Sequence, residues 1–117
     1  MGWKDTNNDG IRDKDGNKLE LVFQTPTDTL YQQIQQAVRQ NLNAVGIAVQ
    51  IKLVDSLVMF GPGANNPDSF LRFNADLMGF DISMYGPDPA DFMVYWTCDL
   101  IPQKANNWAS GNINVER

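Results

Sequence analysis

Three segments in which apolar and polar residues alternate predict β-strands. The first is LELVFQT at 19–25, and Pro26 ends it because proline cannot continue a strand ladder. The second is IAVQIKLVD at 47–55 and the third is FDISMYG at 80–86. In a strand of this kind, one side chain in two faces the core. The pattern therefore predicts three strands, each buried on at least one face.

A helical pattern fills the chain between the first two predicted strands. Either Thr29 begins this helix as a capping box with Gln32, or Asp28 caps it instead. Gly46 is suited to the left-handed residue that closes a helix. The apolar positions expected to face the sheet are Leu30, Ile34, Ala37, Val38, Leu42 and Val45.

The order strand, helix, strand predicts a right-handed crossover between two parallel strands, with the helix lying on the sheet. The sequence SLVMFGPGANNPDS at 56–69 is typical of a loop, and Asn66 with Pro67 indicates the start of a short second helix. That helix is expected to carry Phe70, Leu71, Phe73 and Leu77. The predicted fold class is α/β, with a β-α-β-α-β unit and a mostly parallel sheet. After the third strand, Asp88 before Pro89 indicates one more helix start.

Composition places the chain among ordinary globular proteins and excludes several functions. Its 117 residues suit one domain, and 43% hydrophobic and 20% charged residues are typical values. A net charge of −5 with nine dispersed Lys and Arg residues argues against nucleic acid as a partner. The chain has no His, which removes imidazole-based catalysis, and a single Cys98 cannot form an internal disulfide. A hydrolase that used Asp88 with Asp91 is disfavoured, because no nucleophile or cofactor motif accompanies them. We therefore predict a binding protein rather than an enzyme.

The acidic stretch DTNNDGIRDKDG at 5–16 has two interpretations. Counted from Asp5, it resembles a calcium loop, although the twelfth position is Gly16 and supplies no bidentate carboxylate. The candidate calcium ligands are Asp5, Asn7, Asp9, the carbonyl group of Ile11, and Asp13. The alternative is a solvated turn in which two glycines take positive φ and Asx side chains bond their own backbone. The first interpretation would make the chain a small calcium-dependent interaction module.

A ligand site is expected where parallel strands end, because small ligands bind outside their carboxyl ends. Thr25 and the residues after it would share one edge of the sheet with Tyr85, Gly86 and Asp88. The Asp88 carboxylate would suit a cationic group, although a role as helix cap alone also explains an Asp before proline. Trp108 lies in a polar stretch and is the better ligand candidate among the tryptophans.

Three segments in order resemble the extracellular solute-binding proteins of family 5, which deliver oligopeptides, dipeptides, nickel or sugars to ABC importers. They are GWKDTNNDGIRDKDGNKLEL, NAVGIAVQIKLVD and FDISMYGPDPADFMVYWTCD. The resemblance implies that residues 1–117 form one partial domain, part of the C-terminal ligand-gripping lobe of a two-lobe, type II periplasmic-binding-protein fold. Within it, 5–16 would be an acidic turn, 19–55 a β-α-β unit and 80–117 a cleft-lining segment.

The resemblance also implies the site and the partners. Tyr85 and Asp88 match an aromatic residue and an Asp that pairs with the α-amino group of a bound peptide. Asn107 and Trp108 match a segment that borders the cleft. The expected partners are a peptide or other small solute and, through the whole protein, an ABC transporter permease. The location would be periplasmic or extracellular with a membrane anchor, and open sheet edges would allow a homodimer of this piece.

Overall fold

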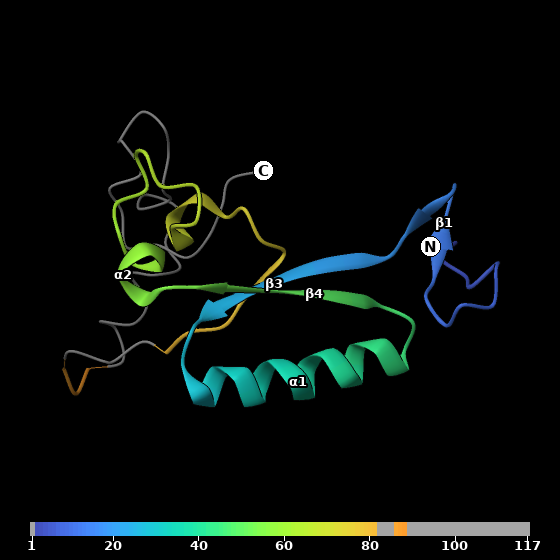
Figure 1. The fold of residues 1–117 in the computed structure, drawn as a ribbon, viewed down its shortest axis with the longest axis horizontal. Helices are drawn as coiled ribbons and strands as arrows, with labels where there is room; N and C mark the ends of the chain where they lie inside the picture. The colour runs from blue at the N-terminus through green and yellow to red at the C-terminus, as the bar shows by residue number, and fades with distance from the viewer. Residues whose placement is uncertain (1, 82–85, 89–117) are drawn as a thin grey trace. The chain divides into compact units, whose positions relative to one another are not determined.

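A computed structural model describes residues 2–81 and 86–88 of the chain (Figure 1). The chain divides into two compact units. The first contains Met1–Leu53 with Ala75–Gly79, and the second contains Val54–Asn74 with Phe80–Arg117. Because of this division, each unit is described by itself. None of the helices within the described residues is long and apolar enough to cross a membrane.

The first unit is built on a parallel sheet of three strands in the order β4-β3-β5. The central strand β3 is Glu20–Pro26, β4 is Ala48–Val54 and β5 is Leu77–Met78. β3 and β5 pair with Phe23 opposite Leu77 and Gln24 opposite Met78. This arrangement confirms the predicted α/β class, the parallel sheet, and the positions of the first two strands to within one residue at each end.

The third strand lies earlier in the chain than predicted. It consists of residues 77–78, whereas the sequence pattern placed it at 80–86. Phe80 and Asp81 are not in a strand, and residues 82–85 lie outside the described residues. Asp76 explains the position of the strand, because its backbone amide donates to Val22 and its carboxylate accepts the Val22 amide at 2.8 Å. These bonds extend the pairing with β3 on the amino side of β5.

Helix α1, Thr29–Ala44, connects β3 to β4 and runs alongside them (Figure 1). Asp28 is its N-cap and accepts from the amides of Leu30 and Tyr31, so the second of the two predicted caps is the observed one. Gly46 follows the C-cap at φ +83°, as predicted.

The buried face of α1 differs from the predicted one. Tyr31 and Gln35 are buried, whereas Leu30 and Ile34 are 61% and 39% exposed. Val45 is exposed too, and only Val38 and Leu42 of the predicted face are half-buried. The helix is therefore rotated so that a polar side chain faces β3. Gln35 donates from Nε2 to Oγ1 of Thr25, and the Thr25 hydroxyl donates to the carbonyl of Pro26. This buried pair joins α1 to β3 within a core that also contains Phe23 and Val49.

A small hairpin precedes the sheet. β1, Asp13–Lys14, pairs antiparallel with β2, Asn17–Lys18. The turn residues Asp15 and Gly16 have φ of 53° and 80°, the two positive values that a two-residue hairpin turn requires. The predicted tight turn at these residues is confirmed.

The second unit contains α2, Ser56–Met59, and a 3-10 helix η1, Phe70–Arg72. Met59 and Leu71 are buried, and three aromatic rings pack together with centroids 5.4–5.8 Å apart. These rings belong to Phe60, Phe70 and Phe80.

Two local predictions in the second unit are wrong. The segment expected to begin as a loop at 56 begins with α2, because the Asp55 carboxylate caps the amide of Leu57. The expected helix from Asn66 is only a turn followed by η1, which Ser69 caps, although Asn66 Oδ1 accepts from the Asp68 amide at 3.1 Å. Leu77, expected on that helix, lies in β5. The predicted helix from Asp88 and the polar tail lie outside the described residues.

Candidate functional site

The acidic stretch is held together by its own side chains. The Asp9 amide donates to Asn7 Oδ1 at 3.1 Å, and the Ile11 amide donates to Asp9 Oδ1 at 2.9 Å. Gly10 has φ +86°, and its amide donates to Asp5 at 3.0 Å. These are Asx turns around a glycine in the left-handed region. The Asx bonds and the positive φ expected from the turn interpretation are thus both observed in this stretch.

Two carboxylates of the stretch, those of Asp13 and Asp9, bond to side chains. Asp13 accepts from the Thr6 hydroxyl at 2.6 Å and from the Thr6 amide at 3.0 Å. Asp9 forms an ion pair with Lys18. Among the described residues, no three carboxylate, thiol or imidazole groups are placed to hold a metal ion together. Calcium binding by Asp5, Asn7, Asp9, Ile11 and Asp13 stays a prediction.

These bonds lower the pKa values of two carboxyl groups. The hydrogen bond from Lys18 is the main cause that lowers the pKa of Asp9 to about 2, with help from the Ile11 amide and the Asn7 side chain. The bonds from Thr6 lower the pKa of Asp13. In turn, Asp9 raises the pKa of Lys18. Asp9, Asp13 and Lys18 therefore keep their charges over the ordinary pH range.

The predicted ligand residues divide between the two units. Thr25 belongs to the first unit, where it is fully buried and bonded to Gln35. Gly86 and Asp88 belong to the second unit, where Gly86 is half-buried and Asp88 is exposed. Tyr85, Asn107 and Trp108 lie outside the described residues. The structure thus gives Thr25 a role in the core, and ligand binding by all six residues stays a prediction.

The parallel pairing places the carboxyl ends of β3 and β5 at one edge of the first unit. Thr27 and Asp28 follow β3 and are exposed, and Gly79 follows β5. The Gly79 amide donates to the carbonyl of Gln24 at 3.0 Å. A Cβ atom on Gly79 would lie 3.1 Å from the Phe23 ring, so the residue needs to be small. This edge is where small ligands bind in parallel sheets.

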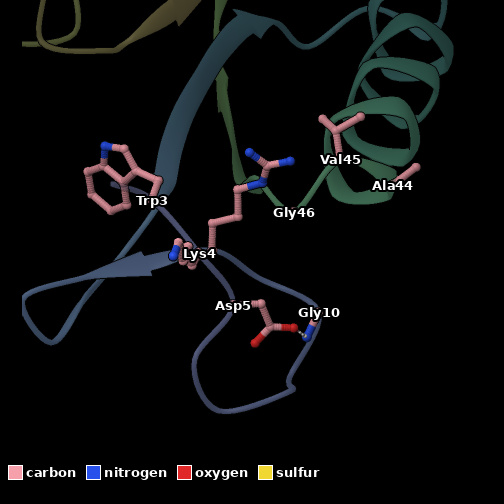
Figure 2. Close-up of a pocket in the computed structure, with 8 residues that line it drawn as sticks. Trp3, Lys4, Asp5, Gly10, Ala44, Val45 and Gly46 are labelled. Carbon is pink, nitrogen blue, oxygen red and sulfur yellow. Dashed lines mark hydrogen bonds between the residues drawn. The ribbon is translucent and has the colours of Figure 1, made fainter. Parts of the chain in front are cut away.

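An open hollow of about 450 Å³ lies at the other end of the first unit (Figure 2). It is lined by Trp3, Lys4, Asp5, Gly10, Arg12, Ala44, Val45 and Gly46. The sequence prediction missed this hollow, because Trp3, Lys4 and Arg12 come together only when the hairpin folds back toward the end of α1.

Comparisons of the sequence and of the structure with known proteins identify relatives of this chain. The chain is 35% identical over 91 residues to the oligopeptide-binding protein AppA of Bacillus subtilis (strain 168), a match that covers 77% of this chain and 16% of the relative. The solved structure of AppA in complex with a nonapeptide matches 66% of this chain and 14% of that one, with 33% identity and a TM-score of 0.52. These matches confirm the predicted resemblance to the extracellular solute-binding proteins of family 5.

Another solved member of this group supports the fold. The oligopeptide-binding protein from Thermus thermophilus, complexed with a pentapeptide, matches 97% of this chain and 20% of that one. Its TM-score is 0.70 at 24% identity, so this likeness bears on the fold alone. No family model matches the chain. The chain spans about one sixth of the length of the curated relative it matches.

Proposed function

We propose that this chain is part of the substrate-binding component of an ABC importer and helps to bind an oligopeptide. The observation that carries the proposal is the 35% identity over 91 residues to an oligopeptide-binding protein. The structure of that protein with a nonapeptide, which this chain matches at a TM-score of 0.52, supports it. The role is binding rather than catalysis, and the partners are a peptide and a transporter permease.

The proposed mechanism is closure of two lobes around the peptide. This chain would supply part of the C-terminal ligand-gripping lobe, with the segment 80–117 along the cleft. A ligand that touches both lobes favours the closed form by its higher affinity for that form. The protein would act outside the cytoplasmic membrane, in the periplasm or the extracellular space, and be anchored to the membrane.

Asp88 is the residue proposed to recognise the peptide. Its carboxylate is exposed, which fits contact with a cationic α-amino group from solvent. Tyr85 and Trp108 would supply aromatic walls, Gly86 would allow close approach of backbone, and Asn107 would offer an amide. Thr25 is buried, so its contribution would be indirect. Its hydroxyl accepts from Gln35 and so holds the end of β3 in place.

A thermal-shift screen on the complete protein that carries this lobe tests the proposed substrate class. Peptides of five to nine residues, simple sugars and nickel chelates are the three sets of probes. Binding at 100 times Kd stabilises the folded state by about 2.7 kcal/mol, which is a readily measured shift in Tm. We expect stabilisation by peptides only. A folded protein that responds to sugars or nickel chelates but to no peptide would contradict the proposal.

A further inference from the structure

The hollow at the amino-terminal end of the sheet is separate from the proposed peptide site. Gly46 lies just before β4, and the Ala48 amide donates to the carbonyl of Leu19, just before β3. The hollow therefore lies by the starts of these strands, whereas ligands of parallel sheets bind at the ends of the strands. All eight lining residues belong to the first unit, so the site is complete within it.

Two cations in the lining lack a partner within the described part of the chain. Neither Lys4 Nζ nor the Arg12 guanidinium has a hydrogen bond or an ion pair there. Of the three nearby carboxylates, Asp9 is ion-paired with another cation, whereas Asp5 and Asp13 accept from neutral donors and keep their negative charge. Asp5 accepts from Gly10, Asp9 pairs with Lys18, and Asp13 accepts from Thr6. Among the residues that line the hollow, these two cations are accompanied by one carboxylate, that of Asp5, so the lining carries a net charge of +1.

Arg12 is held in place by bonds and packing. Its amide donates to the Gly46 carbonyl at 2.8 Å, and its own carbonyl accepts from Leu19 at 2.7 Å. Its side chain lies directly over Gly46, so that an added Cβ there would be 2.8 Å from Arg12 Cγ and 3.2 Å from Nε. The start of the Arg12 side chain is therefore fixed before any ligand arrives, which reduces the entropy lost on binding.

Apolar side chains flank the cations. Figure 2 shows the Trp3 indole on one side, and Ala44 and Val45 at the end of α1 on the other. Trp3 is half-buried and Val45 is 53% exposed. A volume of about 450 Å³ is within the range of small-molecule sites. The lining thus combines a flat aromatic surface with a guanidinium, which binds carboxylates through two parallel hydrogen bonds.

We propose that this hollow binds a small aromatic monocarboxylate. The carboxylate would accept from Arg12 and Lys4, and the ring would lie between Trp3 and Val45. The Asp5 carboxylate in the same lining repels further negative charge, so a single carboxylate is favoured over a polyanion. This site does not depend on the peptide-binding proposal, since no residue is shared between the two.

The test is an NMR titration of the ¹⁵N-labelled chain with benzoate, followed at the indole N–H of Trp3 and the Nε–H of Arg12. Benzamide, which has the same shape without the charge, and acetate, which lacks the ring, are the matched probes. We expect saturable shifts of both signals with benzoate at a Kd on the order of 1 mM, as suits a small ligand. Acetate should bind at least several-fold more weakly. Equal shifts with benzamide, or no shift at about 20 mM benzoate, would overturn the proposal.

Substitutions locate the binding. Arg12→Gln removes the guanidinium and should weaken benzoate binding at least tenfold. Arg39→Gln removes an exposed arginine of α1 that does not line the hollow, and should leave the titration unchanged. Lys4→Gln is a second test with less risk to folding, because the Lys4 side chain is not among the atoms that lie over Gly46. It should also weaken benzoate binding. Benzoate binding that survives both Arg12→Gln and Lys4→Gln would place it elsewhere and refute the site.

Discussion

At the scale of single residues, the Asp9–Lys18 pair shows how the acidic stretch is stabilised. The hydrogen bond from Lys18 lowers the pKa of Asp9 to about 2, below the ordinary value of about 3.9. A carboxyl group with a depressed pKa in the folded state adds stability that is fully present above its unfolded pKa. This contribution is lost as the pH falls from about 4 to about 2. Both groups are exposed, so the contribution is screened by solvent and salt.

Replacing Lys18 with glutamine tests the origin of this shift. Lys18→Gln should raise the pKa of Asp9 toward its ordinary value, because the main hydrogen bond that favours the charged carboxylate becomes weaker. An NMR titration of the Asp9 carboxyl carbon measures the pKa directly. Lys14→Gln is the control, since Lys14 lies in the same hairpin without a role in the shift. An Asp9 pKa that stays near 2 in Lys18→Gln would show that Lys18 is not its cause.

Gly46 combines a left-handed backbone with a close neighbour, and the two effects can be separated. Gly46→Ala should cost more stability than Gly10→Ala, although the φ values are +83° and +86°. Left-handed backbone costs an alanine about 1–2 kcal/mol in both variants. Only at Gly46 would the new Cβ also meet Arg12, since nothing lies within 4 Å of Gly10. Urea unfolding measures both variants, and Arg12→Ala should remove the excess at Gly46. Equal losses at both glycines would contradict this account.

At the scale of elements, the sequence left two possible caps for α1, Asp28 or a capping box at Thr29. The structure has Asp28 as the cap, and mutation can test this. Asp28→Ala should lower the free energy of unfolding by about 1 kcal/mol, because it removes the acceptor of two helix amides. Thr29→Ala should change it by less than about 0.5 kcal/mol, since Thr29 is exposed and is not the cap. Thermal unfolding of the two variants provides the comparison. A larger loss for Thr29→Ala would favour the capping box instead.

The rotation of α1 shows what an apolar pattern cannot reveal. The helix, its length and its closing glycine were predictable, because periodicity and caps are local signals. The inward face was not, because Leu30 and Ile34 offer an apolar stripe while the observed interior contains Gln35. A buried glutamine is tolerated only when it finds a partner, and that partner, Thr25, comes from another element. Such a pair is set by tertiary structure and leaves no periodic signal.

The Gln35–Thr25 bond should therefore contribute strongly to stability. Gln35→Ala should lower the free energy of unfolding by about 1–3 kcal/mol, because it opens a cavity and removes a buried bond. Gln36→Ala is the matched control on the exposed face of the same helix and should stay within about 0.5 kcal/mol. Urea unfolding of both variants gives the values. A loss for Gln35→Ala no larger than for Gln36→Ala would show that apolar burial alone sets the rotation.

At the scale of the whole molecule, the sequence predicted the parallel sheet and the family better than the third strand. The predicted third strand, 80–86, and the observed one, 77–78, lie in one mixed segment, 77–86, in which apolar residues recur. Alternation cannot show which part of such a segment pairs with β3, and the Asp76–Val22 bonds decide it. The ligand residues were predicted from family likeness, and Asp88 is the one among them with a described, exposed side chain.

The most direct test of the central claim is calorimetric titration of the complete protein with a nonapeptide that has either a free or an acetylated α-amino group. If Asp88 pairs with that amine, Asp88→Asn should weaken binding of the free peptide by about 1.5–3 kcal/mol, roughly 10- to 150-fold. Asp15→Asn makes the same charge change in the hairpin turn and should have no effect. Acetylation should weaken binding to the unmodified protein but add little to the loss in Asp88→Asn. Tight binding of the free peptide that is unaffected by Asp88→Asn would contradict the account.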